Sequence, residues 1–580
     1  MKTILSGNAA VARGAYEAGV EIAAAYPGTP STEILEHTAT YEEIYAEWSV
    51  NEKVAFEVAF GGSLGGKRSL AAMKHVGVNV ASDALMTASY TGVNAGLVLV
   101  SADDPGMHSS QNEQDNRYYA RMAKIPMLEP SDSQEARDFT VLAFELSERF
   151  DTPVMLRMTT RVCHGKGAVT QGERQSVPQR AYTKNPQKTV MIPAYARLRH
   201  RFIEERRDRL EAFSETFAHN RVEMGDPAVG IVSSGVAYQY AREVMPDASF
   251  FKLGMTYPLP MVALKDFASK VKRLIVVEEL EPYLEEQLRA AGLEVIGKDV
   301  LPRVGEFSPE LLRSCLVEAD GNVSAAQASD LPARPPAMCP GCPHRGPFSV
   351  LKKLRATVSG DIGCYTLSVL PPQETMDTCV CMGASIGVAQ GLKRSLAGRQ
   401  AERTVAVIGD STFIHSGIPS LVNAVYNGTD ITVLILDNRT TAMTGHQDNP
   451  GTGRTLKGQP APELDFEGLA RAIGVGHVQT VDPIDLEAME RAVREALSAD
   501  GPSVIVAKRA CVLVDRGQFT AGALEVDPER CGLCKLCIRL GCPAISLGED
   551  AVSIDPSLCI GCELCAQVCP SDAISERAAD

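Results

Sequence analysis

The sequence lacks several features that would place the protein in a specialised class. No stretch approaches the ~20 apolar residues that a membrane span needs, and residues 1–7 lack the apolar region of a signal peptide. The chain also has no excess of positive charge, because 57 Lys and Arg stand against 72 Asp and Glu, a formal charge of −15. Nucleic-acid binding is therefore disfavoured, and we expect a cytoplasmic protein that does not contact a membrane.

Length and composition indicate a multidomain globular protein. A chain of 580 residues exceeds what one hydrophobic core organises and predicts roughly three to five domains at ~100–200 residues each. Apolar residues make up 45% and charged residues 22%, as in ordinary soluble domains. Of the sixteen cysteines, eight lie between residues 531 and 569 with the spacing of metal ligands, so thiolate ligation in a reducing compartment fits better than disulfides.

Apolar runs and polar segments divide the chain into units. Runs at 97–100, 229–235 and 273–279 alternate with helical patterns, and the runs 404–408, 431–436 and 503–507 are apolar almost throughout, which is typical of buried parallel strands. We predict α/β domains at 1–165, 226–321 and 337–515, a linker with a surface helix at 166–225, a second linker at 324–336, and a cysteine-dense domain at 521–580.

The cysteine-dense domain contains two similar runs. They are C-x2-C-x2-C-x4-C-P at Cys531, Cys534, Cys537 and Cys542, and C-x2-C-x2-C-x3-C-P at Cys559, Cys562, Cys565 and Cys569. The pattern resembles a bacterial ferredoxin with two [4Fe-4S] clusters, in which the fourth cysteine of each run binds the other cluster. The resemblance implies one cluster on Cys531, Cys534, Cys537 and Cys569, and a second on Cys559, Cys562, Cys565 and Cys542. A zinc module built from C-x2-C pairs is the alternative.

A second motif lies in the third α/β domain. Gly409-Asp410-Ser411 follows one apolar run and Asp437-Asn438 ends the next, which resembles the thiamine diphosphate motif that opens with Gly-Asp-Gly and closes with Asn. The resemblance implies a Mg²⁺ held by Asp410, the Asn438 amide and the Thr440 carbonyl, since this ion needs hard oxygen ligands. Ser411 and Asp437 depart from the usual motif, and a strand that ends in a hydrogen-bonded Asp is the alternative.

Further segments resemble the pyruvate:ferredoxin oxidoreductase superfamily, over nearly the whole chain. They are Tyr26-Pro27-Gly28-Thr29-Pro30, Met73-Lys74-His75-Val76-Gly77, Cys339-Pro340-Gly341-Cys342 and Met443-Thr444-Gly445. The domain order looks most similar to the large (alpha) subunits of indolepyruvate:ferredoxin oxidoreductases. That resemblance implies an α/β fold of doubly wound parallel-sheet domains that bind thiamine diphosphate, plus a C-terminal two-cluster ferredoxin-like α+β domain. Domain 1–165 would bind the pyrimidine, 226–321 would be an accessory domain similar to the C-terminal domain of transketolase, and 337–515 would bind diphosphate and Mg²⁺.

The superfamily resemblance also assigns candidate catalytic residues. Glu52 matches the position of the glutamate that hydrogen-bonds the pyrimidine ring and so favours the imino form of the cofactor. Thr29 and His75 would donate hydrogen bonds to the oxoacid, although Thr29 could instead cap a helix and Lys74 and His75 could be ordinary polar residues. An arginine that binds the carboxylate in pyruvate enzymes would fall near Asp103, and its absence argues against pyruvate as substrate.

Four more cysteines predict a third [4Fe-4S] cluster beside the diphosphate site. Related enzymes place cysteines in this way, here at Cys339, Cys342, Cys364 and Cys511. Cys379 and Cys381 are rival ligands or buried thiols, and Cys163 and Cys315 fit packing roles better.

The resemblance implies an enzyme that decarboxylates indolepyruvate, and also phenylpyruvate, oxidatively with coenzyme A, releasing CO₂ and reducing ferredoxin. Its partners would be a small beta subunit and ferredoxin in an (αβ)2 assembly. Branched-chain or short oxoacids remain alternative substrates. A non-oxidative thiamine-dependent decarboxylase is a different alternative, but it has no use for a two-cluster domain, and an electron-transfer adaptor without an active site is another.

Overall fold

The computed structural model of the protein describes residues 2–317, 336–519 and 521–577. They belong to two compact units, residues 1–330 and 331–580. The linker predicted at 324–336 lies outside the described residues, apart from residue 336. Within the described ranges, none of the helices has the length and apolar character needed to cross a membrane.

The first unit is organised around a seven-stranded sheet, and all of its neighbouring strands are parallel except at one edge. In spatial order the strands are β12 (Met255–Tyr257), β6 (Met127–Leu128), β7 (Val154–Thr159), β5 (Leu97–Asp103), β4 (Ser69–Lys74), β2 (Ile22–Ala25) and β3 (Tyr45–Trp48). The predicted parallel-sheet fold is confirmed here. The carboxyl ends of β2, β4 and β5 lie side by side, which is where ligands bind in such sheets.

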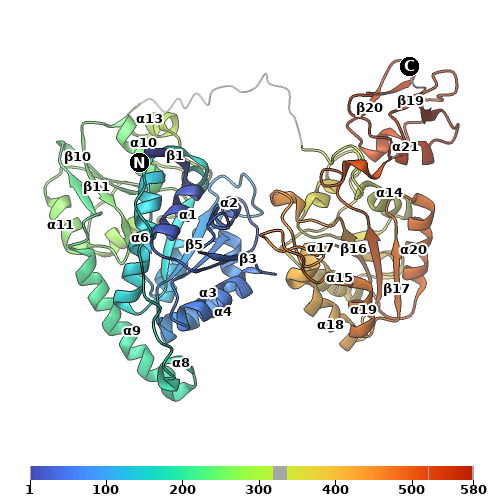
Figure 1. Ribbon diagram of the computed structural model, residues 1–580. Helices are drawn as coiled ribbons and strands as arrows, with labels where there is room; N and C mark the ends of the chain where they lie inside the picture. Colours follow the sequence, from blue (N-terminus) through green and yellow to red (C-terminus); the bar gives the residue numbers. More distant parts are fainter. Residues whose placement is uncertain (1, 318–335, 520, 578–580) are drawn as a thin grey trace. The chain divides into compact units, whose positions relative to one another are not determined.

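Helices cover both faces of this sheet (Figure 1), namely α1 (Gly7–Glu17), α2 (Thr32–Thr38), α3 (Glu52–Leu64), α4 (His75–Thr91), α5 (Arg117–Ala123), α6 (Ser133–Phe150) and α7 (Thr160–His164). Successive residues of a strand point to opposite faces. Ala71, Met73, Leu97 and Leu99 therefore share one face, where they pack with Phe56 of α3 in a fully buried cluster. Burial of a side chain as large as Phe56 contributes about 1.5–3 kcal/mol.

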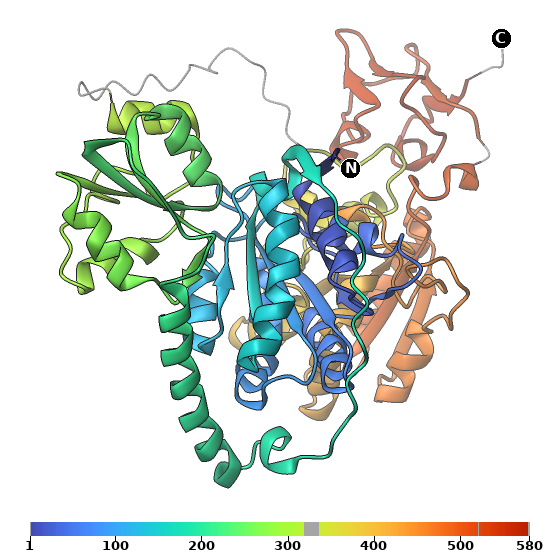
Figure 2. The same ribbon diagram turned by 60° about the vertical axis from the view of Figure 1, so that its left-hand side comes forward.

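The segment predicted as a linker is more ordered than its polar composition suggests. Residues 166–170 form β8 (Lys166–Thr170), which pairs antiparallel with β1 (Lys2–Ser6). A short helix, α8 (Pro186–Thr189), then precedes the long helix α9 (Pro193–Ser214), which Figure 2 shows running down the side of the first unit. Arg206 of α9 is fully buried and donates to the Ser89 carbonyl (3.1 Å) and the Asp151 carbonyl (2.8 Å), so α9 is anchored to the first domain.

A second, four-stranded sheet completes the first unit (Figure 2). In spatial order its strands are β13 (Leu274–Val277), β10 (Asp226–Ser234), β11 (Ala248–Leu253) and β9 (Arg221–Glu223), and its helices are α10 (Gly235–Val244), α11 (Met261–Ser269), α12 (Tyr283–Ala290) and α13 (Pro309–Leu316). Although β12 follows β11 in the chain, it pairs with β6 of the larger sheet. The accessory region is thereby fastened to the first domain through main-chain hydrogen bonds.

The second unit contains a five-stranded sheet in which every neighbouring pair is parallel. In spatial order the strands are β14 (Thr357–Ser359), β15 (Thr404–Gly409), β16 (Thr432–Asp437), β18 (Ser503–Lys508) and β17 (His477–Val481). Leu434 and Ile505 pack against α14 (Arg345–Leu354) and α20 (Leu486–Ser498) on one face. Val433 and Val504 pack on the other face against α15 (Ala384–Ser395), α18 (Ile418–Tyr426) and α19 (Phe466–Ile473).

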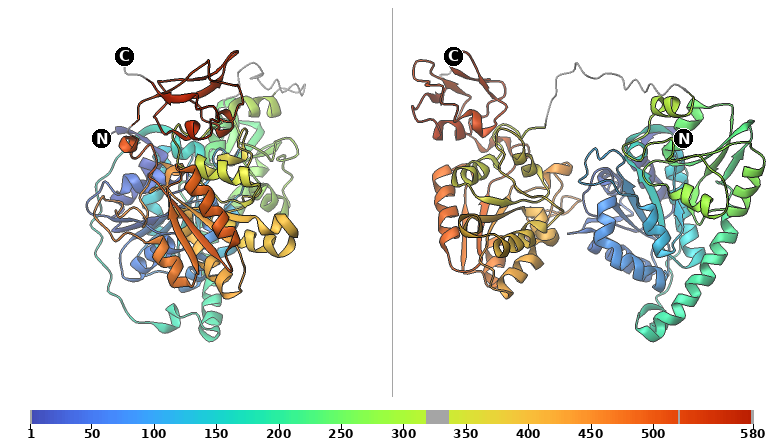
Figure 3. Two further views of the ribbon diagram at one scale, coloured as in Figure 1. Left: turned by 90° about the vertical axis from the view of Figure 1, so that its right-hand side faces the viewer. Right: turned by 180° about the vertical axis from the view of Figure 1, so that it is seen from behind.

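The cysteine-dense region forms a small α+β module that packs at one end of this five-stranded sheet (Figure 3). It has two antiparallel pairs, β19 (Leu524–Val526) with β22 (Ile574–Glu576) and β20 (Ile545–Leu547) with β21 (Val552–Ile554), and one short helix, α21 (Leu564–Gln567). Its small core includes Leu524, Leu540, Val552 and Ile574 together with cysteine side chains. So few apolar residues suggest that metal ligation supplies much of the stability.

Candidate active site

Asp410 lies at the carboxyl end of β15, where ligands bind in open parallel sheets. It begins the short helix α17 (Asp410–Thr412), and a π-helical turn, Phe413–Gly417, follows, a feature frequent at functional sites. The residue is 3% exposed, and its Oδ1 accepts a hydrogen bond from the Ser411 main-chain nitrogen at 2.7 Å. Its Oδ2 is buried and has no hydrogen-bond partner.

A second carboxylate, Asp437, lies beside Asp410. Burial raises the pKa of Asp410 to about 7, and the negative charge of the neighbouring Asp437 also raises it. Burial also raises the pKa of Asp437, whose Oδ2 is buried without a hydrogen-bond partner. A buried carboxylate is costly unless a cation compensates it. The two unsatisfied oxygens therefore fit a divalent cation that takes oxygen ligands.

Amide and carbonyl groups complete the surroundings of Asp410. Asn438 and Thr440 follow β16 and are 7% and 3% exposed. Against the effect of burial, hydrogen bonding from Asn449 and from the Thr440 main chain lowers the pKa of Asp410. Within the described part of the chain, no three His, Cys, Asp or Glu side chains surround one metal position, so a cation here would rely on these amide and carbonyl oxygens as well. The sequence analysis did not predict a role for Asn449. The Asn-Pro-Gly sequence that starts at this residue indicates a turn, but it does not indicate that the turn lies beside Asp410.

The Gly409 motif is tied to the loop that carries Cys364. Tyr365, the next residue, is buried, and its hydroxyl accepts from the Gly409 main-chain nitrogen (2.9 Å) and donates to the Ile362 carbonyl (3.0 Å). A side chain at position 409 would meet the Tyr365 ring, because a Cβ there would lie 2.9 Å from Cε1. Sequence reasoning did not single out Tyr365, whose role depends on contact between two distant loops.

Four predicted cluster ligands influence one another electrostatically near this end of the sheet. Burial raises the pKa of Cys342 to about 12, and the nearby Cys339 and Cys364 add to the rise. Burial raises the pKa of Cys364 to about 11, with Cys511 and Cys339 contributing. The thiols of Cys339, Cys342, Cys364 and Cys511 are thus electrostatic neighbours.

The rival cysteines behave differently. Cys379 and Cys381 are exposed, and after burial the next influence that raises the pKa of each is Asp361. Cys163 is buried, and Cys315 packs against the core of the accessory region. These positions match the packing roles expected for Cys163 and Cys315.

Hydrogen bonds to main-chain carbonyls connect the four-cysteine group with the Asp410 site and with the ferredoxin-like module. On one side, the Cys511 nitrogen donates to the Asn438 carbonyl at 2.9 Å. On the other, the buried Arg345 donates to the Cys339 carbonyl (3.1 Å) and to the Leu540 carbonyl in the ferredoxin-like module (2.7 Å). Gly341, at φ +68°, fits directly against the module, since a Cβ there would lie 2.0 Å from Ile560 Cδ1.

Cysteines of the ferredoxin-like module influence one another electrostatically across the two runs. Burial raises the pKa of Cys537, and Cys534 and Cys569 contribute. Burial likewise raises the pKa of Cys565 to about 12, and the contributing thiols are Cys562, Cys542 and Cys559. The fourth cysteine of each run therefore influences thiols in the triplet of the other run.

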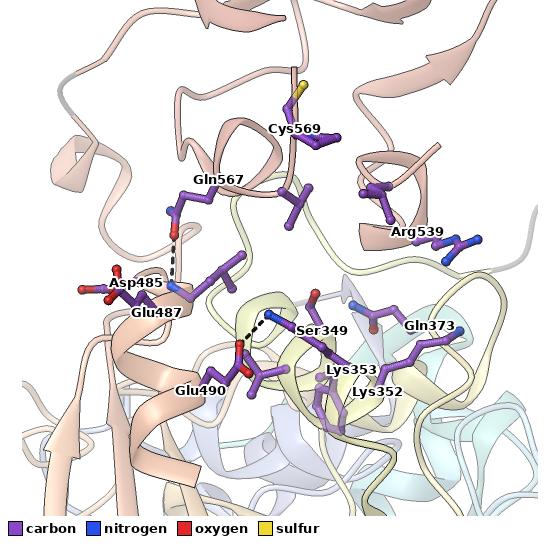
Figure 4. Close-up of a pocket in the computed structure, with 16 residues that line it drawn as sticks. Ser349, Lys352, Lys353, Gln373, Asp485, Glu487, Glu490, Arg539, Gln567 and Cys569 are labelled. Atoms are coloured by element: carbon purple, nitrogen blue, oxygen red, sulfur yellow. Dashed lines mark hydrogen bonds and ion pairs between the residues drawn. The ribbon is translucent and has the colours of Figure 1, made fainter. Parts of the chain in front are cut away.

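A cavity of about 910 Å³ separates parts of the module from α14 and α20 (Figure 4). Gln567 closes one side, because its Oε1 accepts from the Leu486 nitrogen (3.0 Å) and its Nε2 donates to the Ile484 carbonyl (2.9 Å). Lys353 and Glu490 form an ion pair across the floor (2.6 Å), and Cys569 lies at the rim. The two hydrogen bonds of Gln567 attach the module to the domain of the five-stranded sheet.

Glu52 lies at the carboxyl end of the seven-stranded sheet in the first unit. It is the first residue of α3, is 5% exposed, and follows Asn51, whose side chain caps the helix by accepting from the Val54 nitrogen. Gly77 of α4 packs against the carboxylate, since a Cβ there would lie 2.6 Å from Glu52 Cγ and 2.8 Å from Oε1. Glycine is therefore required at position 77 for Glu52 to keep this position.

Thr29 and His75 lie at the same carboxyl end. Thr29 is half-buried and does not cap α2, whose N-cap is Ser31. Its carbonyl accepts from Ser109 Oγ at 3.2 Å. His75 is fully buried, its Nε2 lies 3.2 Å from Asn112 Oδ1, and burial lowers its pKa, so neither His75 nor Lys74 is the solvated polar residue of the alternative interpretation.

The argument against pyruvate as substrate relied on Asp103 lying where a carboxylate-binding arginine would be, but Asp103 is part of a buried ion pair. It is fully buried and pairs with Arg157 of the adjacent strand at 2.9 Å. Burial raises its pKa to about 6, which Arg157 opposes. Because this side chain points into the interior, it does not mark a place from which a substrate-binding arginine is missing, and the substrate preference has to rest on other observations.

Comparison with known proteins gives matches to three family models. The family model for pyruvate flavodoxin/ferredoxin oxidoreductase, thiamine diphosphate-binding, matches residues 13–214; the thiamine pyrophosphate enzyme C-terminal binding domain matches 361–507; and a 4Fe-4S binding domain matches 552–575. The fold and the site define a thiamine-diphosphate-dependent 2-oxoacid:ferredoxin oxidoreductase subunit that carries iron–sulfur clusters.

Relatives identify the family more narrowly. The chain is 43% identical to the indolepyruvate oxidoreductase subunit IorA of Methanothermobacter thermautotrophicus and 42% identical to that of Archaeoglobus fulgidus, in both cases over 99% of this chain and 97% of the relative. A solved 2-oxoglutarate:ferredoxin oxidoreductase from Magnetococcus marinus aligns with a TM-score of 0.47 at 20% identity, over 54% of this chain and 64% of that one. The chain belongs to the IorA family of indolepyruvate oxidoreductase subunits.

Proposed function

We propose that the chain is the catalytic subunit that oxidatively decarboxylates indolepyruvate and phenylpyruvate. The keto acid, coenzyme A and two oxidised ferredoxins would give aryl-acetyl-CoA, CO₂, one proton and two reduced ferredoxins. The observation that carries the proposal is a pair of connections on either side of the cysteines. Cys511 bonds to Asn438, and Arg345 bonds to both Cys339 and Leu540 of the ferredoxin-like module, while Cys339 and Cys511 influence each other electrostatically. A decarboxylase that does not transfer electrons has no need for such a connection.

Bound thiamine diphosphate would supply a nucleophilic carbon for the ketone and an electron sink for the decarboxylation. Asp410, Asn438 and the Thr440 carbonyl would hold the Mg²⁺ that binds its diphosphate, with Asp437 as a further carboxylate nearby. Glu52 would hold a proton at the pyrimidine nitrogen, and Thr29 and His75 would donate to the oxoacid.

Electrons would leave through three [4Fe-4S] clusters. The group at Cys339, Cys342, Cys364 and Cys511 would take them first, and the two clusters of the module would follow, one on Cys559, Cys562, Cys565 and Cys542 and the other on Cys531, Cys534, Cys537 and Cys569. Two observations support this order: the main-chain bond between Cys511 and Asn438, and the packing of Gly341 against Ile560, which lies between Cys559 and Cys562. Reduced ferredoxin would be the product at the far end.

Partners complete the proposal. The relatives are named as subunits, and we propose a small beta subunit and an (αβ)2 assembly in the cytoplasm. The decisive experiment is an anaerobic assay of the purified complex with indolepyruvate, phenylpyruvate and pyruvate, each with coenzyme A and ferredoxin. Aryl pyruvates are expected to give the higher kcat/KM. A higher value for pyruvate would overturn the proposed substrate class, and turnover without ferredoxin reduction would overturn the reaction type.

A further inference from the structure

Lys74 is a buried cation that no catalytic role described above uses. It is the last residue of β4 and the N-cap of α4, and it is 9% exposed. Its Nζ donates to the Ser109 carbonyl at 2.6 Å and lies 3.4 Å from Ser109 Oγ. Within the described ranges, no carboxylate lies within 4 Å of this ammonium group. A buried ammonium without a paired anion is unfavourable, so an anionic ligand would stabilise it.

The surroundings of Lys74 are the predicted substrate residues. Its stem packs against Gly28, where a Cβ would lie 3.1 Å from Lys74 Cβ. Ser109, which accepts from its Nζ, donates in turn to the Thr29 carbonyl at 3.2 Å. Three residues further along α4, Gly77 packs against Glu52. Lys74 therefore lies between the Thr29 loop and the residue proposed to activate the cofactor.

The charge balance of this group favours an anion. Asp104 is the carboxylate that influences Lys74. Its oxygens already accept hydrogen bonds from other groups: Oδ2 from the Ser109 nitrogen (2.9 Å) and Ser110 Oγ (2.6 Å), and Oδ1 from Thr160 Oγ1 (2.7 Å). Burial lowers the pKa of Lys74 to about 8, which still leaves it mostly charged at neutral pH. An ammonium has three donors. The carbonyl and, at 3.4 Å, the hydroxyl of Ser109 accept from two of them, so one is left for a ligand.

We propose that Lys74 binds the carboxylate of the 2-oxoacid substrate and that this charge-assisted contact selects a 2-oxoacid over a neutral ketone. The inference rests on the proposed function, since it assigns a residue within the same site. A lysine has a flexible stem and a point charge, so it can follow the carboxylate while the aryl group sits elsewhere in the pocket. Lys74 would thus supply the cation that binds the substrate carboxylate.

The test compares wild type with Lys74→Met, Lys74→Arg and the control Lys265→Met, which removes an exposed lysine of α11. All four are purified anaerobically as the complete complex, and thiamine diphosphate affinity and iron content are measured first. Loss of one hydrogen bond to a charged group predicts that Lys74→Met raises the KM for indolepyruvate about 10- to 100-fold. Lys74→Arg should recover part of the loss, and Lys265→Met should match wild type.

Two inhibitors separate charge recognition from general damage. Indole-3-lactate carries the carboxylate, whereas indoleacetone has a methyl group in its place. Lys74→Met should raise the inhibition constant of indole-3-lactate by the same factor as the KM and leave that of indoleacetone within about twofold. Equal changes for both inhibitors, or unchanged KM values, would overturn the inference while the proposed function stands. Absence of indolepyruvate turnover by wild type would overturn the proposed function, and this inference with it.

Discussion

The carboxyl ends of the two larger sheets bury unpaired charges of opposite sign. In the second unit, Asp410 and Asp437 each keep a buried carboxylate oxygen without a hydrogen-bond partner. In the first unit, Lys74 is a buried ammonium that is held by a carbonyl and not by a carboxylate. A buried charge without its counterion indicates the sign of the missing ligand. The first arrangement suits a cation and its diphosphate, and the second suits a carboxylate.

The largest effect is expected for Glu52→Gln, which tests the proposal that Glu52 acts on the cofactor and not on the metal. Glu52→Gln keeps the shape of the side chain that packs on Gly77, but it cannot hold the proton in the same way. Hydrogen–deuterium exchange at C2 of bound thiamine diphosphate should slow by roughly two or more orders of magnitude, the usual contribution of a general acid–base group. Mg²⁺ and iron contents should stay at wild-type values. Unchanged exchange would remove Glu52 from the mechanism.

The next change removes the negative charge from the second unit. Asp410→Asn should weaken Mg²⁺-dependent binding of thiamine diphosphate by about a hundredfold, since even outer ligands of a metal site contribute 10- to 100-fold. Calorimetric titration with thiamine diphosphate and Mg²⁺ measures the effect.

The same variant should be more stable than wild type when no Mg²⁺ or thiamine diphosphate is added. The folded-state pKa of Asp410 is raised to about 7 by burial and by Asp437, so the folded protein binds this proton more tightly than the unfolded chain. Stability should therefore fall as pH rises from about 4 to about 7 in wild type and fall less in the variant. A lower melting temperature for Asp410→Asn at pH 7.5 would contradict the view that this carboxylate is an unfavourable charge awaiting a cation.

A pH profile tests the positive charge in the first unit. Burial lowers the pKa of Lys74 to about 8 against the opposing effect of Asp104, so the cation is present below that pH and lost above it. The kcat/KM for indolepyruvate should fall about tenfold per pH unit on the alkaline side. Lys74→Arg should abolish this fall, because a guanidinium stays charged.

The other titratable groups around Lys74 do not mimic this behaviour. Burial lowers the pKa of His75, which is therefore neutral throughout this range. Burial would raise the pKa of Asp104, but hydrogen bonds from Ser110, Ser109 and Thr160 outweigh it and lower that pKa, so Asp104 stays charged. The same alkaline fall in Lys74→Arg would show that another group titrates.

The smallest change is expected in the iron content when one of the cysteines between the Asp410 site and the ferredoxin-like module is replaced. Each [4Fe-4S] cluster contains four irons, so a fully reconstituted chain should hold about twelve irons with three clusters and about eight with two. Cys511→Ser should lower the count by about four and leave the spectrum of the module's pair unchanged. A wild-type count near eight, with no change in the variant, would show that Cys339, Cys342, Cys364 and Cys511 do not hold a cluster.

The sequence by itself determined those parts of the protein in which local spacing dictates chemistry. Near-continuous apolar runs such as 503–507 predicted buried parallel strands, because a strand covered on both faces has no polar side. The two cysteine runs predicted the iron–sulfur module, because three thiolates at C-x2-C-x2-C spacing converge on one cluster. The segment 166–225 was predicted less well: the pairing of β8 with β1 is a contact over some 160 residues that polar composition cannot reveal.

Tertiary structure decided everything that depends on two distant segments meeting. Asn449 and Tyr365 gained their roles from loops that lie beside Asp410 and Gly409 only after folding. Asp103 looked like a substitution in a substrate pocket, but strand pairing places Arg157 next to it in the interior. Lys74 looked like a polar residue in a motif, and only its burial without a carboxylate partner marks it as a ligand for an anion. Charge compensation is a property of three-dimensional neighbours, which is why spacing along the chain did not reveal it.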